Sequence, residues 1–193
     1  MIVKTKNNKA IIDDVIEPET FKVMQEFWLG KDVPWSYNQG VVFDEDTDFQ
    51  FVYLVWDFDH IPHPNIWSLV QPVLHVLRPY SLIKIKANLR TRGHEVVESR
   101  EHTDNHQAGA FTAIFYIDTN DGYTFFEDGD KFESVENRLI IFPSHMKHGG
   151  TTCTNSNRRT VLNFNYVPQP DAEIADALLT DADKDYIKKW HNR

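Results

Sequence analysis

A histidine and an aspartate two residues apart are the first feature of the sequence that points to chemistry. Among nine histidines, only His102 has an aspartate at this spacing, Asp104. A chain of this composition contains roughly one such pair by chance, so the pair alone is weak support. In an extended strand, however, residues i and i+2 project from the same face, and an imidazole and a carboxylate there can bind one metal ion. The pair is therefore a candidate for two ligands of a metal site.

A third ligand is expected from a later strand. An apolar run ends at Pro143, and His148 follows next to two glycines that let the backbone approach a site closely. Two histidines and one carboxylate form the face that holds non-haem Fe(II) while leaving coordination positions open. His145 is the alternative ligand from the same segment. His148 is favoured because His145 lies nearer the end of the strand and lacks an adjacent glycine.

A fixed cation would complete the site if its open positions take a chelating α-keto acid with a distal carboxylate. Arg159 begins a predicted strand soon after His148, and a guanidinium binds a carboxylate through two charge-assisted hydrogen bonds. Tyr116, on the strand that follows the histidine–aspartate pair, offers a hydroxyl to the same carboxylate. Arg158 is the alternative cation, because a slip of one residue would exchange the faces of the two arginines.

The register of this last strand follows from its alternating side chains. If Arg159 faces inward, the residues that share its face are Val161, Asn163 and Asn165. The other face is then apolar and can pack under helices; it consists of Leu162, Phe164 and Tyr166. This division into a polar and an apolar face favours Arg159 over Arg158 as the inward cation.

Short strands separated by turns dominate the middle of the chain. Seven apolar runs lie between residues 81 and 167, with turn-rich separators such as the Asn120-Asp121-Gly122 segment. The runs are 82–90, 96–98, 110–118, 123–126, 132–135, 138–142 and 159–167. This pattern predicts an antiparallel barrel or sandwich of the jelly-roll type.

Helical patterns flank the β-rich region, and one further strand is predicted at 51–56. Apolar residues recur at helical spacing over 18–29 and 66–77, and one or two helices are predicted over 171–192. These N-terminal and C-terminal helices are expected to pack on one face of the strands. We therefore predict a single, mainly β domain over residues 1–193 with a β core at about 81–167.

Six blocks of this sequence together resemble the 2-oxoglutarate- and Fe(II)-dependent dioxygenases, and among them the prolyl-4-hydroxylase-like group. The blocks are HTD at 102–104, AIFYID at 113–118, DGYTFF at 121–126, NRLIIFP at 137–143, HG at 148–149 and RTVLNFNY at 159–166. Their order and spacing over residues 81–167 are more specific than the three ligands alone. The resemblance implies a double-stranded β-helix, which agrees with the jelly roll predicted from the turns.

The resemblance also implies roles for individual residues. His102, Asp104 and His148 would bind Fe(II), Arg159 would bind the distal carboxylate of the cosubstrate 2-oxoglutarate, and Tyr116 would assist Arg159. No catalytic residue beyond the metal ligands is implied. The implied reaction hydroxylates a C–H bond of a peptide or a small molecule with O2 and releases succinate and CO2. The alternatives are a cupin-like metal-binding protein without redox activity and a structural jelly-roll module with incidental histidines.

Net charge and composition limit the expected partners. The chain has 29 acidic and 20 basic residues, a net charge of −9, so binding to nucleic acid or to an anionic membrane is not expected. The acidic surface favours a neutral or basic substrate such as a peptide. A single cysteine, and an N-terminus without the apolar core of a signal peptide, favour a cytoplasmic setting. The oligomeric state is not specified by these features.

Overall fold

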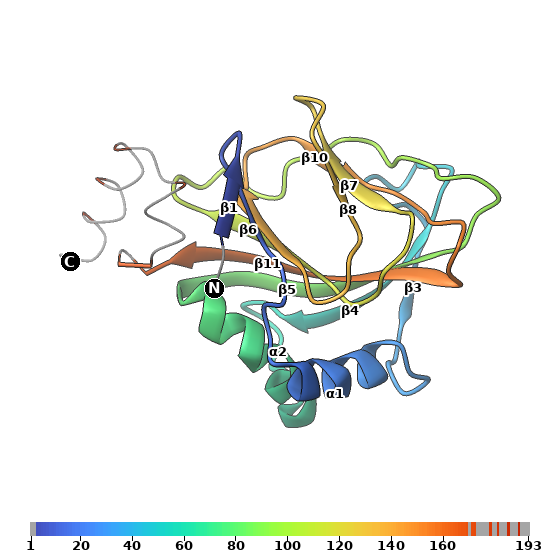
Figure 1. Ribbon diagram of the computed structural model, residues 1–193, viewed down its shortest axis with the longest axis horizontal. Coiled ribbons are helices and arrows are strands. Elements are labelled where there is room, and N and C mark those ends of the chain that lie inside the picture. Colours follow the sequence, from blue (N-terminus) through green and yellow to red (C-terminus); the bar gives the residue numbers. More distant parts are fainter. Residues whose placement is uncertain are drawn as a thin grey trace.

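Two antiparallel sheets make up most of the chain. The computed structural model describes residues 3–169 together with 171, 172, 178, 181, 185 and 189, and it describes side chains from residue 5 onward. The C-terminal helices predicted over 171–192 therefore fall almost entirely outside the described residues. The two sheets lie one above the other (Figure 1).

The larger sheet has eight strands and the smaller has three. The larger sheet runs in the order β1-β2-β9-β6-β11-β5-β4-β3, and the smaller in the order β10-β7-β8. The strands of the larger sheet are β1 (Val3–Lys6), β2 (Lys9–Ile12), β3 (Ser36–Asn38), β4 (Gln50–Trp56), β5 (Pro79–Thr91), β6 (Phe111–Tyr116), β9 (Leu139–Pro143) and β11 (Arg158–Pro168). Those of the smaller sheet are β7 (Tyr123–Phe126), β8 (Lys131–Glu133) and β10 (His148–Gly150). The predicted mainly β, jelly-roll class is confirmed.

Two helices cover the outer face of the larger sheet, the face turned away from the smaller sheet (Figure 1). They are α1 (Pro18–Trp28) and α2 (Pro64–Leu77), each with a proline in the first turn, where the missing N–H is not needed. The Glu17 carboxylate caps α1 by accepting from the backbone of Glu19 and Thr20. Both predicted helices are present, although α2 begins earlier than expected and includes Pro72. None of the helices in the described residues is long and apolar enough to cross a membrane.

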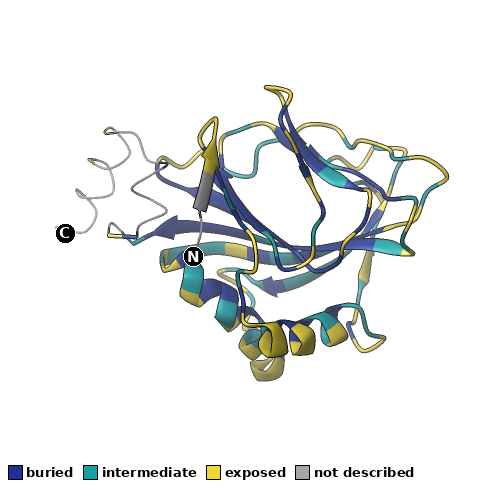
Figure 2. Cartoon of the chain, in the orientation of Figure 1, coloured by how far each residue is buried: buried dark blue, intermediate teal, exposed yellow. Residues whose placement is uncertain are grey.

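The two faces of β11 pack into different layers, which is what the alternation predicted. Leu162, Phe164 and Tyr166 are buried in the core beneath the helices, together with Trp28 and Val70. A second, smaller apolar cluster lies between the two sheets and consists of Ile114, Tyr116, Phe126, Phe132, Ile140, Phe142 and Val161. Figure 2 shows the buried strands between the half-exposed helices and the turns at the opposite edge.

Buried charges fasten the N-terminal hairpin to the turn between β7 and β8. The Lys9 ammonium is fully buried, 2.5 Å from Oδ2 of Asp128 and 3.0 Å from Oδ2 of Asp130. Lys6 pairs with the other oxygen of Asp130 at 2.5 Å. Lys9 also lies over the ring of Phe126, 4.7 Å from its centroid. These ion pairs and the two helices therefore lie on opposite sides of the smaller apolar cluster.

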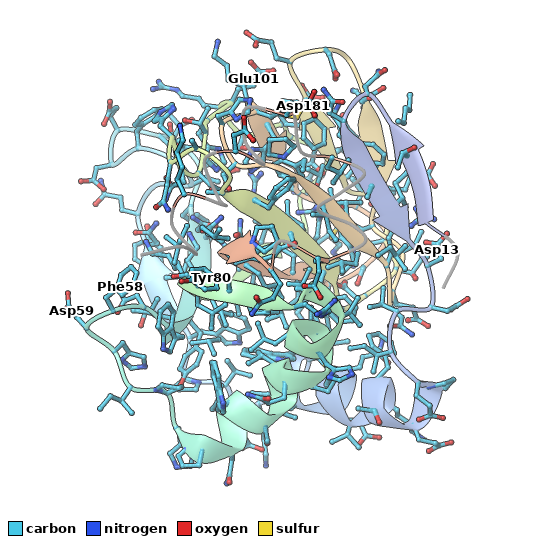
Figure 3. The ribbon with its side chains drawn as sticks, turned by 90° about the vertical axis from the view of Figure 1, so that its left-hand side faces the viewer. Asp13, Phe58, Asp59, Tyr80, Glu101 and Asp181 are labelled. Atoms are coloured by element: carbon cyan, nitrogen blue, oxygen red, sulfur yellow. The ribbon has the colours of Figure 1, made fainter. Side chains whose placement is uncertain are left out.

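The connection between β4 and α2 carries side chains that point into solvent. Figure 3 shows Phe58 and Asp59 at the outer edge of the molecule, and both are exposed. This loop is far from the buried charges of the N-terminal hairpin in the same view, where Asp13 marks the opposite side.

Several strands differ from the sequence prediction. Residues 96–98 do not form a strand; this segment contributes an isolated bridge between Glu98 and Thr151. Four short strands, β1, β2, β3 and β10, were not predicted. β1 and β2 are joined by Asn7 and Asn8, both with positive φ, as a tight hairpin turn requires. β10 is a His-Gly-Gly segment, and glycine is depleted in strands, so its strand character comes from pairing with β7.

Candidate metal centre and the cavity beside it

Backbone pairing brings the two histidines of the candidate metal centre together. The N–H of His102 donates to the carbonyl of His148 at 2.9 Å, and the N–H of His148 donates back to His102 at 2.9 Å. The N–H of Asp104 donates to the carbonyl of Ser144 at 3.1 Å. The segment that follows β5 is thereby held beside β10, and the ring centroids of the two histidines lie 4.6 Å apart.

The ligand atoms of His102, Asp104 and His148 converge on one point. These atoms all lie within 4.8 Å of one another. Nε2 of His102 is 3.5 Å from Oδ1 of Asp104, and Nε2 of His148 is 3.7 Å from Oδ2. Metal–ligand bonds of about 2.0–2.2 Å put neighbouring ligand atoms roughly 3 Å apart or somewhat more, so the three side chains fit around a divalent first-row metal ion. His145 is exposed and is not part of this group.

His148 has the tautomer and the charge state of a metal ligand. Its Nδ1 lies 3.0 Å from the carbonyl oxygen of Met146. Because a carbonyl can only accept, Nδ1 carries the proton and the lone pair of Nε2 faces Asp104. Burial lowers the pKa of His148, against the opposing effect of the Asp104 carboxylate, and so favours the neutral imidazole that binds metals.

One oxygen of Asp104 is held by three hydrogen bonds. Oδ2 accepts from the hydroxyl of Thr112 at 2.8 Å and from the amides of Asn163 at 3.2 Å and Asn165 at 3.0 Å. Burial acts to raise the pKa of Asp104, but the interactions of its carboxylate with His102 and His148 and the hydrogen bond from Thr112 outweigh it and hold this pKa well below its usual range. Asp104 is therefore an oriented, ionised carboxylate.

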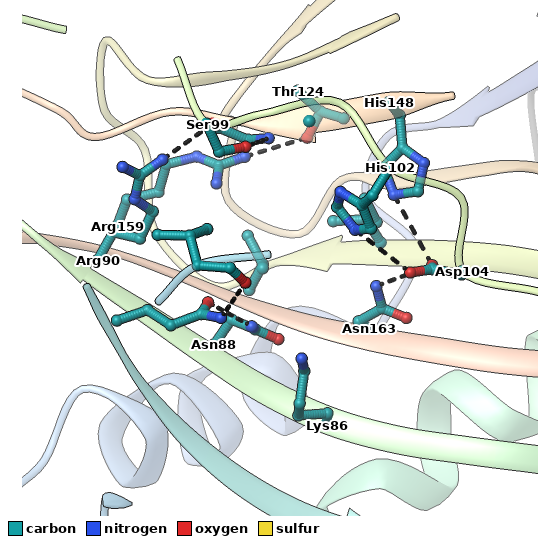
Figure 4. A pocket seen from close by; sticks show the side chains of 16 residues that line it. Lys86, Asn88, Arg90, Ser99, His102, Asp104, Thr124, His148, Arg159 and Asn163 are labelled. Carbon is teal, nitrogen blue, oxygen red and sulfur yellow. Dashed lines mark hydrogen bonds and ion pairs between the residues drawn. The ribbon is translucent and has the colours of Figure 1, made fainter. Parts of the chain in front are cut away.

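A cavity leads from this triad to Arg159 between the two sheets (Figure 4). Arg159 is almost fully buried, and its Nε donates to the hydroxyl of Ser134 at 2.7 Å while Nη2 donates to that of Thr124 at 3.1 Å. Burial lowers the pKa of Arg159, an effect that Tyr116 and Asp118 partly oppose. Within the described part of the chain, no carboxylate forms an ion pair with Arg159. The far end of the cavity is thus a desolvated cation without a charged partner.

The two predicted arginines lie on opposite sides of β11. Arg159 lines the cavity, as the alternation predicted, whereas Arg158 donates to the carbonyl of Leu29 at the end of α1. Tyr116 does not line the cavity. Its hydroxyl donates to Thr124 at 2.8 Å, and the Arg159 guanidinium lies 5.6 Å from the centroid of its ring. The hydroxyl that faces the cavity next to Arg159 is therefore that of Thr124, which was not predicted.

A polar face of β5 also lines the cavity, and the sequence reasoning missed it. Lys86, Asn88 and Arg90 point into the cavity (Figure 4). The residues that alternate with them, Ile85, Ala87 and Leu89, are buried on the other face. Polar and apolar residues alternate along β5 as they do along β11. The sequence therefore contained the information needed to predict which residues of β5 face the cavity.

Comparisons with known proteins agree with this geometry at the level of the fold. No family model and no curated protein matches the sequence. Among solved structures, the chain is similar to a Pseudomonas putida prolyl-4-hydroxylase (TM-score 0.55, 11% identity, 83% of this chain and 92% of that one). It is also similar to a 2OG-Fe(II) oxygenase family oxidoreductase from Burkholderia pseudomallei (TM-score 0.59, 10% identity, 83% and 85%). A third is HygX from Streptomyces hygroscopicus with nickel and 2-oxoglutarate bound (TM-score 0.54, 11% identity, 84% and 83%). The chain has the fold of the 2-oxoglutarate- and Fe(II)-dependent oxygenases.

Proposed function

We propose that this chain is an Fe(II)- and 2-oxoglutarate-dependent dioxygenase that hydroxylates a C–H bond with O2 and releases succinate and CO2, most specifically of the prolyl-4-hydroxylase-like kind. One observation carries the proposal: the triad and the buried, unpaired Arg159 open onto one cavity. A buried cation without an anion is costly, so its presence at this place calls for an anionic ligand. 2-Oxoglutarate supplies such an anion at the end opposite to its chelating oxygens.

Three side chains would hold the metal in this proposal: His102 and His148 through Nε2, and Asp104 through its carboxylate. When bound, Fe(II) and 2-oxoglutarate supply the reduction of O2 that converts 2-oxoglutarate to succinate and CO2 and places one oxygen atom in the substrate C–H bond. The chain contributes a fixed ligand geometry. The hydrogen bonds to Asp104 and His148 maintain that geometry before any ligand binds.

The other end of the cavity would bind the distal carboxylate of 2-oxoglutarate. The Arg159 guanidinium and the Thr124 hydroxyl are both placed to donate to it. Ser134 fixes Nε of Arg159, and Tyr116 supports Thr124 from below, which is the assisting role we now propose for this tyrosine. Ile114 and Val161 form apolar walls that limit the access of water.

The alternative, a cupin-like protein that binds Zn(II) or Mn(II) without redox chemistry, would use the same three ligands. That alternative leaves Arg159 without an anionic ligand. It also gives no role to the three hydroxyl groups that support Arg159, those of Ser134, Thr124 and Tyr116. The two functions differ in one measurable property. Only the dioxygenase needs an anion-binding end at a fixed distance from the metal.

An anaerobic titration tests the proposal. Purified protein loaded with Fe(II) is expected to develop a visible charge-transfer band when 2-oxoglutarate is added under nitrogen, and Arg158→Gln should behave like wild type. His102→Ala is expected to lose the metal and with it the band. In air, succinate release would then be measured across proline-containing peptides and free amino acids. Iron that is bound by the protein without giving the band would favour the cupin-like alternative.

A further inference from the structure

A lysine in the cavity has no role in the function proposed above. Lys86, on β5, lines the cavity together with the triad and Arg159. Figure 4 shows its ammonium pointing into the cavity, in the space between Asn88 and Asn163. Within the described residues, no hydrogen bond or ion pair joins this ammonium to another group. Burial lowers the pKa of Lys86, while the charge of Asp104 opposes that change.

The other two cations of the cavity already have partners. Arg90 pairs with Asp48 and donates to the carbonyl of Gly150 at 2.9 Å. Arg159 is assigned to 2-oxoglutarate in the proposed function. Asp104, the carboxylate that influences Lys86, would be engaged by the metal ion. Among the residues that the structure describes, Lys86 is therefore the cation that remains available in the loaded site.

The net charge of the loaded cavity also indicates that Lys86 is available to a further ligand. Lys86, Arg90 and Arg159 are cationic, and Asp48 and Asp104 are anionic. A divalent iron ion and the doubly charged 2-oxoglutarate cancel each other. The loaded cavity would thus keep one positive charge in excess, at Lys86, and a partly desolvated charge of this kind favours an anionic ligand.

We propose that Lys86 binds a carboxylate group of a small-molecule substrate and holds that substrate beside the triad. This inference rests on the proposed function. The whole chain carries a charge of −9, which favours a neutral or basic substrate at long range. Inside the cavity the preferred charge of the substrate is reversed, because the unpaired Lys86 ammonium faces the cavity and attracts an anion.

The walls beside the cavity favour a small molecule over a protein chain. Val41 lines the cavity, and the segment after it is fastened by two ion pairs, Asp48 with Arg90 and Asp46 with Arg100. The first pair joins this segment to β5, and the second joins it to the segment that contains Arg100. We expect a wall fastened in this way to admit a small carboxylate more readily than a loop of another protein.

A pairwise titration tests the role of Lys86. Wild-type protein is first loaded with Fe(II) and 2-oxoglutarate under nitrogen. It is then titrated with free amino acids, with N-acetyl amino acids and with the carboxamides of these N-acetyl amino acids. The shift of the visible band is recorded. Each N-acetyl acid and its carboxamide have nearly the same size and differ by one negative charge. At least one acid is expected to shift the band at a concentration roughly tenfold lower than its carboxamide. Lys86→Gln should remove this preference and leave the 2-oxoglutarate titration unchanged.

Lys84 provides the matched control, because it lies two residues earlier on β5 and is exposed. Lys84→Gln is expected to keep the preference for the acid. Absence of the band in wild-type protein with Fe(II) and 2-oxoglutarate alone would refute the proposed function itself. If the band forms, each of three results would overturn the Lys86 inference. The first is equal action of the acids and their carboxamides, and the second is weaker 2-oxoglutarate binding in Lys86→Gln. The third is a shift of the band by acidic peptides, titrated in the same way, and by no small carboxylate.

Discussion

The side-chain amide of Asn165 donates to Oδ2 of Asp104 at 3.0 Å, and to the hydroxyl of Thr112, which binds the same oxygen, also at 3.0 Å. Asn165 lies on β11 and Thr112 on β6, so two neighbouring strands of the larger sheet orient one proposed metal ligand. The sheet therefore orients this carboxylate together with the loop that carries Asp104.

Removal of the Asn165 amide should weaken metal binding. We expect Asn165→Ala to raise the dissociation constant for Co(II) or Mn(II) roughly tenfold, since partners that orient a metal ligand typically contribute this much to affinity. The constant would be measured by competition with a chelator. Asn155→Ala, in the turn before β11, is a control that removes an asparagine away from the triad. An unchanged dissociation constant in Asn165→Ala would show that the hydrogen bond from Asn165 to Asp104 has no role in metal affinity.

Two histidines in one segment offer a direct test of the ligand set. His148→Ala should abolish metal binding, because a triad reduced to two ligands no longer forms a facial site. His145→Ala, three residues earlier and exposed, should bind metal as wild type does. Metal content after dialysis against a weak chelator distinguishes the two variants. Loss of metal in both would mean that His145 also contributes.

The two arginines at the start of β11 form a second matched pair. Arg159→Gln is expected to weaken 2-oxoglutarate binding roughly hundredfold, because the distal carboxylate loses charge-assisted hydrogen bonds in a desolvated site. Arg158→Gln, whose guanidinium contacts the end of α1, should bind 2-oxoglutarate normally. The half-saturating concentration from the anaerobic band is the measurement. Equal affinities in the two variants would remove Arg159 from the proposed binding site.

Asp130 should make the stability of the protein depend on pH in acid. The hydrogen bond from Lys6, together with those from Lys9 and Asn7, outweighs burial and lowers the pKa of Asp130 to about 2. A carboxyl whose pKa is lower in the folded than in the unfolded state stabilises the fold above its unfolded pKa, near 4, and loses this contribution as the pH falls toward 2. Asp130→Asn should therefore lower the free energy of unfolding by a constant amount from pH 7 to about pH 5, and by less below pH 4.

Denaturant unfolding followed by tryptophan fluorescence at several pH values measures this difference. Asp59→Asn is the control, because Asp59 lies at the outer edge of the β4–α2 loop (Figure 3), far from the hairpin. It should change the free energy of unfolding little at any pH. A difference between wild type and Asp130→Asn that stays constant down to pH 2 would contradict the assignment.

The sequence was most informative where a strand lies between two layers. β11 and β5 each have helices on one side and the cavity on the other, so apolar and polar residues must alternate along them. For β11 this alternation was sufficient to predict that Arg159 faces inward. β5 has the same pattern, and Lys86 could have been recognised from it.

The strands that were missed depend on partners far away in the sequence. β2 pairs with β9, and β10 pairs with β7, although neither β2 nor β10 has a strong strand pattern of its own. Thr124 was missed for a related reason: its place beside Arg159 follows from how the smaller sheet lies over β11. Local sequence patterns contain little information about such packing.

β10 connects the two ends of the cavity over only three residues. His148, the first, belongs to the triad, and a Cβ placed on Gly150, the last, would lie 3.2 Å from Nη1 of Arg159. Residues two apart in a strand are separated by roughly 6.6 Å. In the proposed function, this short strand would set the distance between the metal ion and Arg159. We expect a keto acid with two methylene groups before its distal carboxylate to fit this distance, so oxaloacetate and 2-oxoadipate, with one and three, should compete with 2-oxoglutarate at least about tenfold less well. Equal competition in the anaerobic titration would mean that the Arg159 side chain moves to fit keto acids of different length and does not select one length.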